Sequence, residues 1–222
     1  MSREFVPKRP QYYWIERIYT EIIILFLPFL KKTFITPNMV TAFNLIITLP
    51  LLCYTAWFEK YYIAAVLIQV YLFIDILDGN LARYKNLCSD FGKKLDKVTD
   101  ILFYTGFYII LGYRVGLSIY TIAAFIFVFH LYGITATFYI VPRLRKLTVV
   151  RRWGLKRILF EKGFLFGMDN GMQDVLMTIF LFTPYKQAPF YISMVLYIID
   201  MCYRLIELGR NQEIEKTEGI SL

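Results

Sequence analysis

The sequence predicts an all-α integral membrane protein with six transmembrane helices and an N-terminal amphipathic helix on the cytoplasmic surface of the membrane. Three observations lead to this prediction. The composition is 58% hydrophobic and 18% aromatic, whereas soluble domains are only about 45–50% apolar. Six apolar segments approach the length of about 20 residues that a helix needs to cross a bilayer. Lys and Arg residues gather in alternate connections between these segments.

The elements follow one another in a simple order. Residues 10–30 mix Glu16, Arg17 and Glu21 with apolar residues, which is typical of a helix lying on the membrane surface, and Pro28 is expected to help end it. The expected spans are 39–58, 61–81, 97–113, 117–141, 163–183 and 188–207. We therefore expect a cytoplasmic arm over 1–36, a six-span domain over 37–208 and a cytoplasmic tail over 209–222.

The positions of the basic residues predict the orientation. Of the 25 Lys and Arg residues, 22 fall in the N-terminal arm, the 82–97 turn, the 143–162 loop and the C-terminal segment that begins at Arg204. The other three connections hold only Lys60, Arg114 and Lys186. Because cytoplasmic loops carry the excess of positive charge, both termini and the 82–97 turn are predicted to be cytoplasmic in a multi-pass protein of the cell membrane. The net charge of +8 is thus explained by the lipid bilayer, and no nucleic-acid partner is expected.

The cysteines exclude two other classes of protein. Cys53, Cys88 and Cys202 are odd in number and scattered, and no CxxC pair occurs. Neither a disulfide framework nor a zinc site is therefore predicted.

Four aspartates lie in or beside apolar helical sequence. Asp75 and Asp78 are three residues apart and Asp96 and Asp100 four apart, so each pair shares one face of its helix. The polar residues 82–94 can turn the chain back, and two antiparallel helices would bring the four carboxylates together. Carboxylates at a membrane boundary are costly without cations. The pattern predicts a site for a hard divalent metal, expected to be two Mg²⁺ ions for which Mn²⁺ can substitute.

The aspartates belong to a longer motif. The stretch reads Asp75-x2-Asp78-Gly79-x2-Ala82-Arg83-x8-Gly92-x3-Asp96-x3-Asp100. It resembles the signature of the CDP-alcohol phosphotransferases, also called CDP-alcohol phosphatidyltransferases, at each fixed position. The resemblance extends to Pro37-Asn38-Met39-Val40-Thr41 at the start of the first span and to the expected architecture.

This resemblance implies an enzyme and assigns roles to its residues. Asp75, Asp78 and Asp96 would be metal ligands, and Asp100 would be the general base and a further ligand. Arg83 can pair with phosphate in a planar geometry that Lys cannot reproduce, and glycine permits close approach of a helix or nucleotide. The residues implied for binding the CDP-linked donor are Asn38, Thr41, Gly79, Ala82, Arg83, Ser89 and Gly92. The family resemblance also implies a homodimer.

The acceptor side is less sharply defined. Arginines of the 143–162 loop either bind an acceptor phosphate or only fix the topology beside anionic lipid. The candidates are Arg143, Arg145, Arg151, Arg152 and Arg157. The polar residues Asp169, Asn170, Gln173 and Asp174 of the expected fifth span either line the acceptor cavity or cap and hydrogen-bond neighbouring helices. His130 is expected to be a hydrogen-bonded core residue.

Three functions remain open from the sequence. In the first, the phosphatidyl group of CDP-diacylglycerol moves to a small polar alcohol such as inositol phosphate, glycerol phosphate or serine, with release of CMP, in phospholipid biosynthesis. In the second, a soluble CDP-alcohol donates its phospho-alcohol to a lipid or glycan-precursor hydroxyl. A non-enzymatic ion transporter or scaffold would need the carboxylates midway across the bilayer, and their position at a cytoplasmic edge counts against it.

Overall fold

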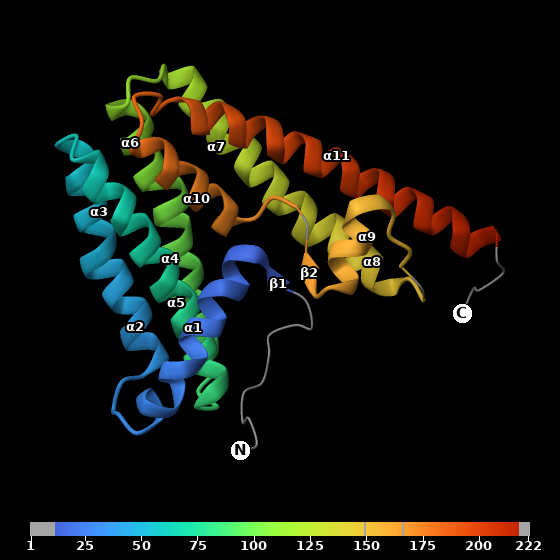
Figure 1. The fold of residues 1–222 in the computed structure, drawn as a ribbon, viewed down its shortest axis with the longest axis horizontal. Coiled ribbons are helices and arrows are strands. Elements are labelled where there is room, and N and C mark those ends of the chain that lie inside the picture. Colours follow the sequence, from blue (N-terminus) through green and yellow to red (C-terminus); the bar gives the residue numbers. More distant parts are fainter. Residues whose placement is uncertain (1–11, 149, 166, 218–222) are drawn as a thin grey trace.

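The computed structural model describes residues 12–148, 150–165 and 167–217, most of which are helical (Figure 1). The helices are α1 (Trp14–Lys31), α2 (Pro37–Phe43), α3 (Leu49–Trp57), α4 (Tyr61–Tyr84), α5 (Asp90–Ile101), α6 (Tyr108–Arg114), α7 (Ile119–Ile134), α8 (Val141–Lys146), α9 (Gly154–Glu161), α10 (Asn170–Leu181) and α11 (Ala188–Thr217). Two-residue strands, β1 (Tyr12–Tyr13) and β2 (Phe164–Leu165), pair in parallel.

Three π-helical turns join shorter helices into long ones. They are η1 (Asn44–Thr48) between α2 and α3, η2 (Leu102–Phe107) between α5 and α6, and η3 (Thr135–Ile140) between α7 and α8. Pro50 follows η1 and Pro142 follows η3. Proline cannot donate the helical hydrogen bond, and a π-helical turn lets the helix continue past this interruption.

Four helical runs among the described residues are long and apolar enough to cross a membrane. They are Pro37–Trp57, Tyr61–Tyr84, Ile119–Lys146 and Ala188–Thr217. The expected span over 97–113 lies within a continuous helix from Asp90 to Arg114, whose N-terminal half is rich in charged residues. The chain is thus helical and suited to crossing a membrane several times, while the count of six spans stays a prediction.

The expected helix over 163–183 is wrong in its first part. Gly163 has a φ of +85°, a left-handed conformation that ends the preceding helix. α10 begins only at Asn170, because the Asp169 side chain caps it by accepting the backbone N–H of Met172 at 3.0 Å. At about 1.5 Å per residue, this helix is shorter than the hydrocarbon core of a bilayer.

The main core surrounds α4 and is strongly aromatic. Tyr71 of α4 stacks on Phe103 with ring centroids 3.8 Å apart. Phe107, Tyr108 and Phe190 are fully buried in the same cluster. α10 packs along α4, and α2 packs against both α4 and α5. α2 therefore fixes α4 and α5 relative to each other.

The terminal helices differ from the expectation in their limits. α1 begins at Trp14, continues past Pro28, and buries Ile23 and Leu27 against Leu81 of α4. Its opposite side exposes apolar residues, among them Leu25 at 76%. The start expected near residue 10 lies outside the described residues. α11 runs to Thr217, so the tail expected from residue 209 begins as helix.

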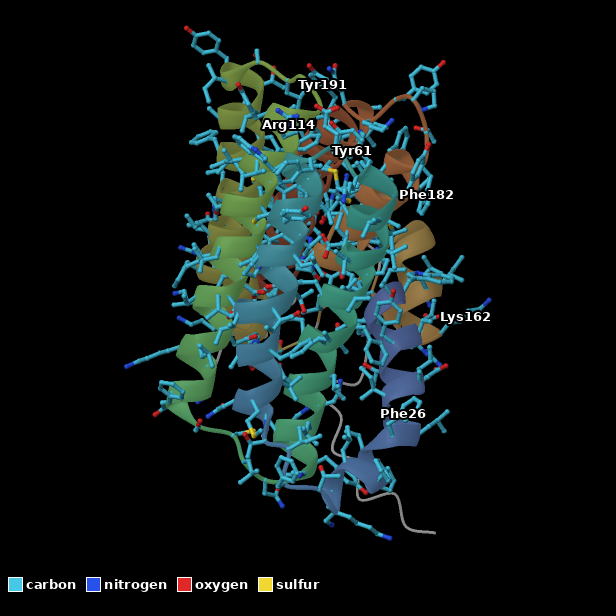
Figure 2. The ribbon with its side chains drawn as sticks, turned by 90° about the vertical axis from the view of Figure 1, so that its left-hand side faces the viewer. Phe26, Tyr61, Arg114, Lys162, Phe182 and Tyr191 are labelled. Atoms are coloured by element: carbon cyan, nitrogen blue, oxygen red, sulfur yellow. The ribbon has the colours of Figure 1, made fainter. Side chains whose placement is uncertain are left out.

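The three connections with little basic charge meet at one end of the molecule. The Tyr61 hydroxyl donates to the Arg114 carbonyl at 2.7 Å, and Lys186 Nζ lies 5.2 Å from the centre of the Tyr61 ring. Figure 2 shows Tyr61, Arg114 and Tyr191 near this end and Phe26 toward the opposite end. The grouping agrees with the charge pattern, and the side of the membrane that each end faces stays a prediction.

Candidate active site

A cavity of about 430 Å³ lies among α4, α5, α7, α10 and α11. Its wall contains all four predicted aspartates, Asp75, Asp78, Asp96 and Asp100. The other polar or charged residues that line it are Tyr13, Glu16, Asn80, Arg83, Tyr132, Thr137, Asp169, Asn170 and Arg204. The cavity therefore has a carboxylate-rich side on α4 and α5, and a second side formed by α7, the start of α10, α11 and the residues around Tyr13.

Three of the aspartates form a possible ligand set. One carboxylate oxygen from each of Asp75, Asp78 and Asp96 lies within 4.8 Å of the other two. Oxygen ligands that surround one Mg²⁺ at about 2.1 Å lie up to roughly 4.2 Å apart, so small side-chain rotations would complete the set. Because all the donors are carboxylate oxygens, the site fits a hard divalent cation. Asp100 lines the same cavity without belonging to this group of three.

Local structure explains why the two pairs of aspartates face each other. The Ser89 hydroxyl accepts the Gly92 N–H at 3.0 Å and caps α5, which fixes where this helix begins. A Cβ atom at Gly92 would lie 2.7 Å from Asn38 Oδ1, so glycine allows α5 to approach α2. The chain reverses within residues 85–89, fewer than the 82–94 expected from the sequence.

The predicted donor-binding residues divide into two groups. Gly79 and Arg83 line the cavity, where Arg83 Nη2 donates to Asn80 Oδ1 at 2.8 Å. A Cβ atom at Gly79 would lie 3.6 Å from Arg83 Nη1, so the absence of a side chain keeps the space beside the guanidinium open. The residues that do not line it are Asn38, Thr41, Ala82, Ser89 and Gly92. Contact of these five with a donor stays a prediction.

A hydrogen-bonded network centred on Asp200 contacts the lining residues Tyr132 and Arg204 of the second side. Arg204 Nε donates to Asp200 Oδ2 at 2.7 Å, and Arg204 Nη2 donates to the Tyr13 hydroxyl at 2.7 Å. The Tyr132 hydroxyl donates to Asp200 Oδ2 at 2.7 Å, and Lys156 Nζ donates to Asp200 Oδ1 at 3.3 Å. Burial lowers the pKa of Lys156, and the charge of Asp200 opposes this effect.

The arginines predicted to bind the acceptor do not line the cavity. The guanidinium of Arg143 lies 3.7 Å from the centre of the Tyr139 ring, and that of Arg152 lies 3.7 Å from the centre of the Phe160 ring. Arg157 pairs with Glu161 at 2.9 Å on the surface. The backbone N–H of Arg151 donates to Asn211 Oδ1 at 2.7 Å. A role of these side chains, or of Arg145, in acceptor binding stays a prediction that the cavity does not support.

The other polar residues of the expected spans lie either at the cavity or in the interior of the helical bundle. Asp169 and Asn170 line the cavity. Asp174 is buried in the aromatic core, where its carboxylate accepts the hydroxyls of Tyr104 at 3.0 Å and Tyr108 at 2.7 Å. Gln173 is fully buried. His130 Nε2 lies 2.9 Å from Thr105 Oγ1, in agreement with the expected hydrogen-bonded position.

Sequence reasoning missed Tyr13, Glu16, Tyr132 and Arg204 as cavity residues. Arg204 and Asp200 are four residues apart on one helix, and this spacing of opposite charges within an apolar span was a usable signal. Tyr13 lies 191 residues from Arg204 along the chain, and no local pattern connects the two.

Comparison with known protein families gives one match to this chain. A family model described as CDP-alcohol phosphatidyltransferase matches residues 34–206. Among curated protein sequences, none matches this chain.

Solved structures of one membrane enzyme share the fold. Phosphatidylinositol phosphate synthase of Mycobacterium tuberculosis with CDP-DAG bound is 15% identical, has a TM-score of 0.56 and is matched over 86% of this chain and 94% of its own. The same protein with manganese and citrate is 15% identical, with a TM-score of 0.56 and coverage of 86% and 88%. Its apo form is 16% identical, with a TM-score of 0.56 and coverage of 83% and 95%.

Proposed function

Since the chain belongs to the CDP-alcohol phosphatidyltransferase family, we propose that it transfers the phosphatidyl group of CDP-diacylglycerol to a small polar alcohol and releases CMP. The observation that carries this proposal is the set of oxygens from Asp75, Asp78 and Asp96 within 4.8 Å of one another. They line a cavity bounded by helices suited to a membrane. The binding of CDP-DAG by a protein of the same fold supports a lipid-linked donor.

We assign different steps of the reaction to different residues of the cavity. Asp75, Asp78 and Asp96 would hold divalent metal, expected to be two Mg²⁺ ions with Mn²⁺ as a substitute. When bound, this metal would neutralise the pyrophosphate of the donor and stabilise the departing CMP. Arg83 lies on the same wall and would hold phosphate oxygens of the donor through its planar guanidinium.

Asp100 is the proposed general base. It lies one helical turn beyond Asp96, lines the same cavity and does not belong to the group of three oxygens. Its carboxylate would take the proton of the acceptor hydroxyl. The acceptor oxygen would then bond to the phosphorus that carries diacylglycerol, while the bond from this phosphorus to the CMP oxygen breaks. The acceptor proton ends on Asp100 and the bond electrons leave with CMP.

The test is a product balance with purified protein in lipid nanodiscs. With CDP-diacylglycerol, Mg²⁺ and an alcohol, CMP and a new phospholipid should appear in equal amounts. Asp78→Asn is the inactive control. CMP formed instead from CDP-choline or CDP-ethanolamine with diacylglycerol would overturn the choice of donor in favour of a soluble CDP-alcohol.

Assembly and orientation are part of the same proposal. The family resemblance makes a homodimer the expected assembly, and light scattering of the detergent-solubilised protein tests it. Both termini and the mouth of the carboxylate cavity are proposed to face the cytoplasm, on the side opposite the Lys60, Arg114 and Lys186 connections.

A further inference from the structure

One face of α11 is polar and buried. Asp200, Arg204, Glu207 and Asn211 follow one another at spacings of four, three and four residues, so they share one side of the helix. Asp200 is 8% exposed, Glu207 7% and Asn211 1%. Polar groups are costly to bury unless they are hydrogen-bonded. This face therefore needs polar partners, and the segment 148–156 supplies several of them.

Asn211 binds the backbone of this segment directly. Its Oδ1 accepts the Arg151 N–H at 2.7 Å, and its Nδ2 donates to the Arg151 carbonyl at 3.0 Å. The same Nδ2 donates to the Glu207 carbonyl of α11 at 2.8 Å. A single amide thus binds both backbone groups of a residue 60 positions away in the chain, which requires a side chain with both an acceptor and a donor. We call these two contacts with Arg151 the Asn211 clamp.

Two further contacts hold the segment on either side of the clamp. Glu215 Oε1 accepts the backbone N–H of Thr148 at 3.0 Å and the Thr148 hydroxyl at 3.1 Å. The guanidinium of Arg210 lies 5.9 Å from the centre of the Trp153 ring. The segment is therefore attached to the C-terminal end of α11 before, at and after the clamp.

The segment leads from the clamp to the cavity through α9. Lys156 of α9 donates through Nζ to Asp200 Oδ1 at 3.3 Å. Asp200 Oδ2 accepts Arg204 Nε and the Tyr132 hydroxyl, each at 2.7 Å. Arg204 and Tyr132 line the second side of the cavity, whereas Asn211 does not. The position of these two lining residues thus depends on contacts that reach back to the clamp.

We propose that Asn211 is a positioning residue for the acceptor: its clamp holds the segment 148–156 on α11 and thereby fixes the second side of the cavity, where the acceptor binds. The inference rests on the proposed transferase function, which assigns the carboxylate side to the metal and the CDP-linked donor and leaves the opposite side to the acceptor. It adds a residue outside the cavity whose loss affects one of the two substrates.

The first test is a change of equal size. Asn211→Asp keeps an acceptor for the Arg151 N–H, but the carboxylate cannot donate to the Arg151 carbonyl. The acceptor is whichever of inositol 1-phosphate, glycerol 3-phosphate and serine gives the fastest CMP release. Its KM should rise by about three- to tenfold, while the KM for CDP-diacylglycerol stays unchanged.

The control for this variant lies on the next residue. Gln212→Glu makes the same change of amide to carboxylate about 100° further round the helix, and it should leave both KM values unchanged. An equal rise of both KM values in Asn211→Asp, or no rise, would overturn the positioning role.

A second variant avoids a new charge in the interior and decides the question if Asn211→Asp does not yield a folded protein. Glu215→Ala removes the acceptor that binds Thr148. The acceptor KM should rise by about two- to fivefold with the KM for CDP-diacylglycerol unchanged. Glu213→Ala, at an exposed glutamate two residues earlier, is the control. An acceptor KM equal to that of the control would contradict the proposal.

Limited proteolysis tests the clamp without using the reaction. Trypsin cuts a backbone only after it has left its partners. Cleavage after Arg151 and Arg152, followed by mass spectrometry in nanodiscs, should be about fivefold or more faster in Asn211→Asp and Glu215→Ala than in wild type and the two controls.

The two measurements together distinguish the possible failures. Faster cleavage with a rise in the acceptor KM alone is the expected result. Unchanged cleavage would overturn the clamp, and faster cleavage without a selective rise in the acceptor KM would overturn the role in acceptor binding. If the wild type released no CMP with any acceptor, the proposed function and the acceptor role would both fail, while the cleavage rates would still test the clamp.

Discussion

The Thr41 hydroxyl of α2 donates a hydrogen bond to Asp78 Oδ2 of α4 at 2.5 Å, and both residues are buried. α2 also packs against α5, which carries Asp96 and Asp100. Thr41 therefore orients one member of the carboxylate set from a helix that contacts both halves of the set. Partners of metal-binding carboxylates fix their orientation and tune affinity for the metal.

Substitution of Thr41 should weaken metal binding rather than donor binding. Thr41→Val keeps the shape of the side chain but removes the donor, so the Mg²⁺ concentration for half-maximal CMP release should rise by about tenfold. Thr41→Ser restores the hydroxyl and should stay close to wild type. A rise in the KM for CDP-diacylglycerol at saturating Mg²⁺ would instead support the direct contact between Thr41 and the donor that the sequence predicts.

Removal of charge from the ligand set should abolish activity without unfolding the protein. Asp75→Asn, Asp78→Asn and Asp96→Asn should each lose CMP release, because a neutral amide cannot balance the charge of a divalent ion. Mn²⁺ should replace Mg²⁺, and excess chelator should stop the reaction. Asp90→Asn is the control on the same helix, since Asp90 is exposed, pairs with Lys93 and lies outside the cavity lining. Full activity in chelator would rule out metal dependence.

Asp100 should behave differently from the other three aspartates. Asp100→Asn removes the proposed base, so turnover should fall by about 10²–10⁴-fold while binding of the CDP-linked donor is nearly kept. Donor binding is measured by displacement of a fluorescent CDP analogue beside the turnover assay. If Asp100→Asn loses donor binding as completely as Asp75→Asn, Asp100 acts chiefly as a metal ligand.

Labelling of single cysteines tests the orientation. In a variant without Cys53, Cys88 and Cys202, cysteines placed at Lys60, Arg114 and Lys186 should react with a membrane-impermeant maleimide added to intact cells. A cysteine at Lys93 should react only after the membrane is opened. If the cysteine at position 93 were labelled in intact cells, the predicted topology would be reversed.

The carboxylate side of the site could be predicted because its geometry is local. Asp75 and Asp78 share a helix face through their spacing, as do Asp96 and Asp100, and only a short reversal separates the two helices. The start of α10 could have been predicted better, since Gly163 and Gly167 interrupt the apolar stretch before the capping Asp169.

The second side of the cavity could not be predicted from the sequence, because it depends on contacts between distant segments. Tyr13 reaches Arg204 only because β1 pairs with β2 and brings the N-terminal residues beside residues 164–165. The arginines of the 143–162 loop illustrate the opposite case. Their charge suggested an acceptor site, but aromatic rings and surface carboxylates bind several of them away from the cavity.

The most direct test of the carboxylate site as a metal-dependent catalytic centre is an electron paramagnetic resonance titration of Mn²⁺. It is carried out on wild type, Asp96→Asn, Asp100→Asn and Asp90→Asn, with CMP release measured on the same samples. Tight Mn²⁺ binding should be present in wild type, Asp90→Asn and Asp100→Asn and lost in Asp96→Asn, while CMP release should remain high only in wild type and Asp90→Asn. Equal Mn²⁺ binding by wild type and Asp96→Asn, or undiminished CMP release by Asp96→Asn, would contradict the assignment.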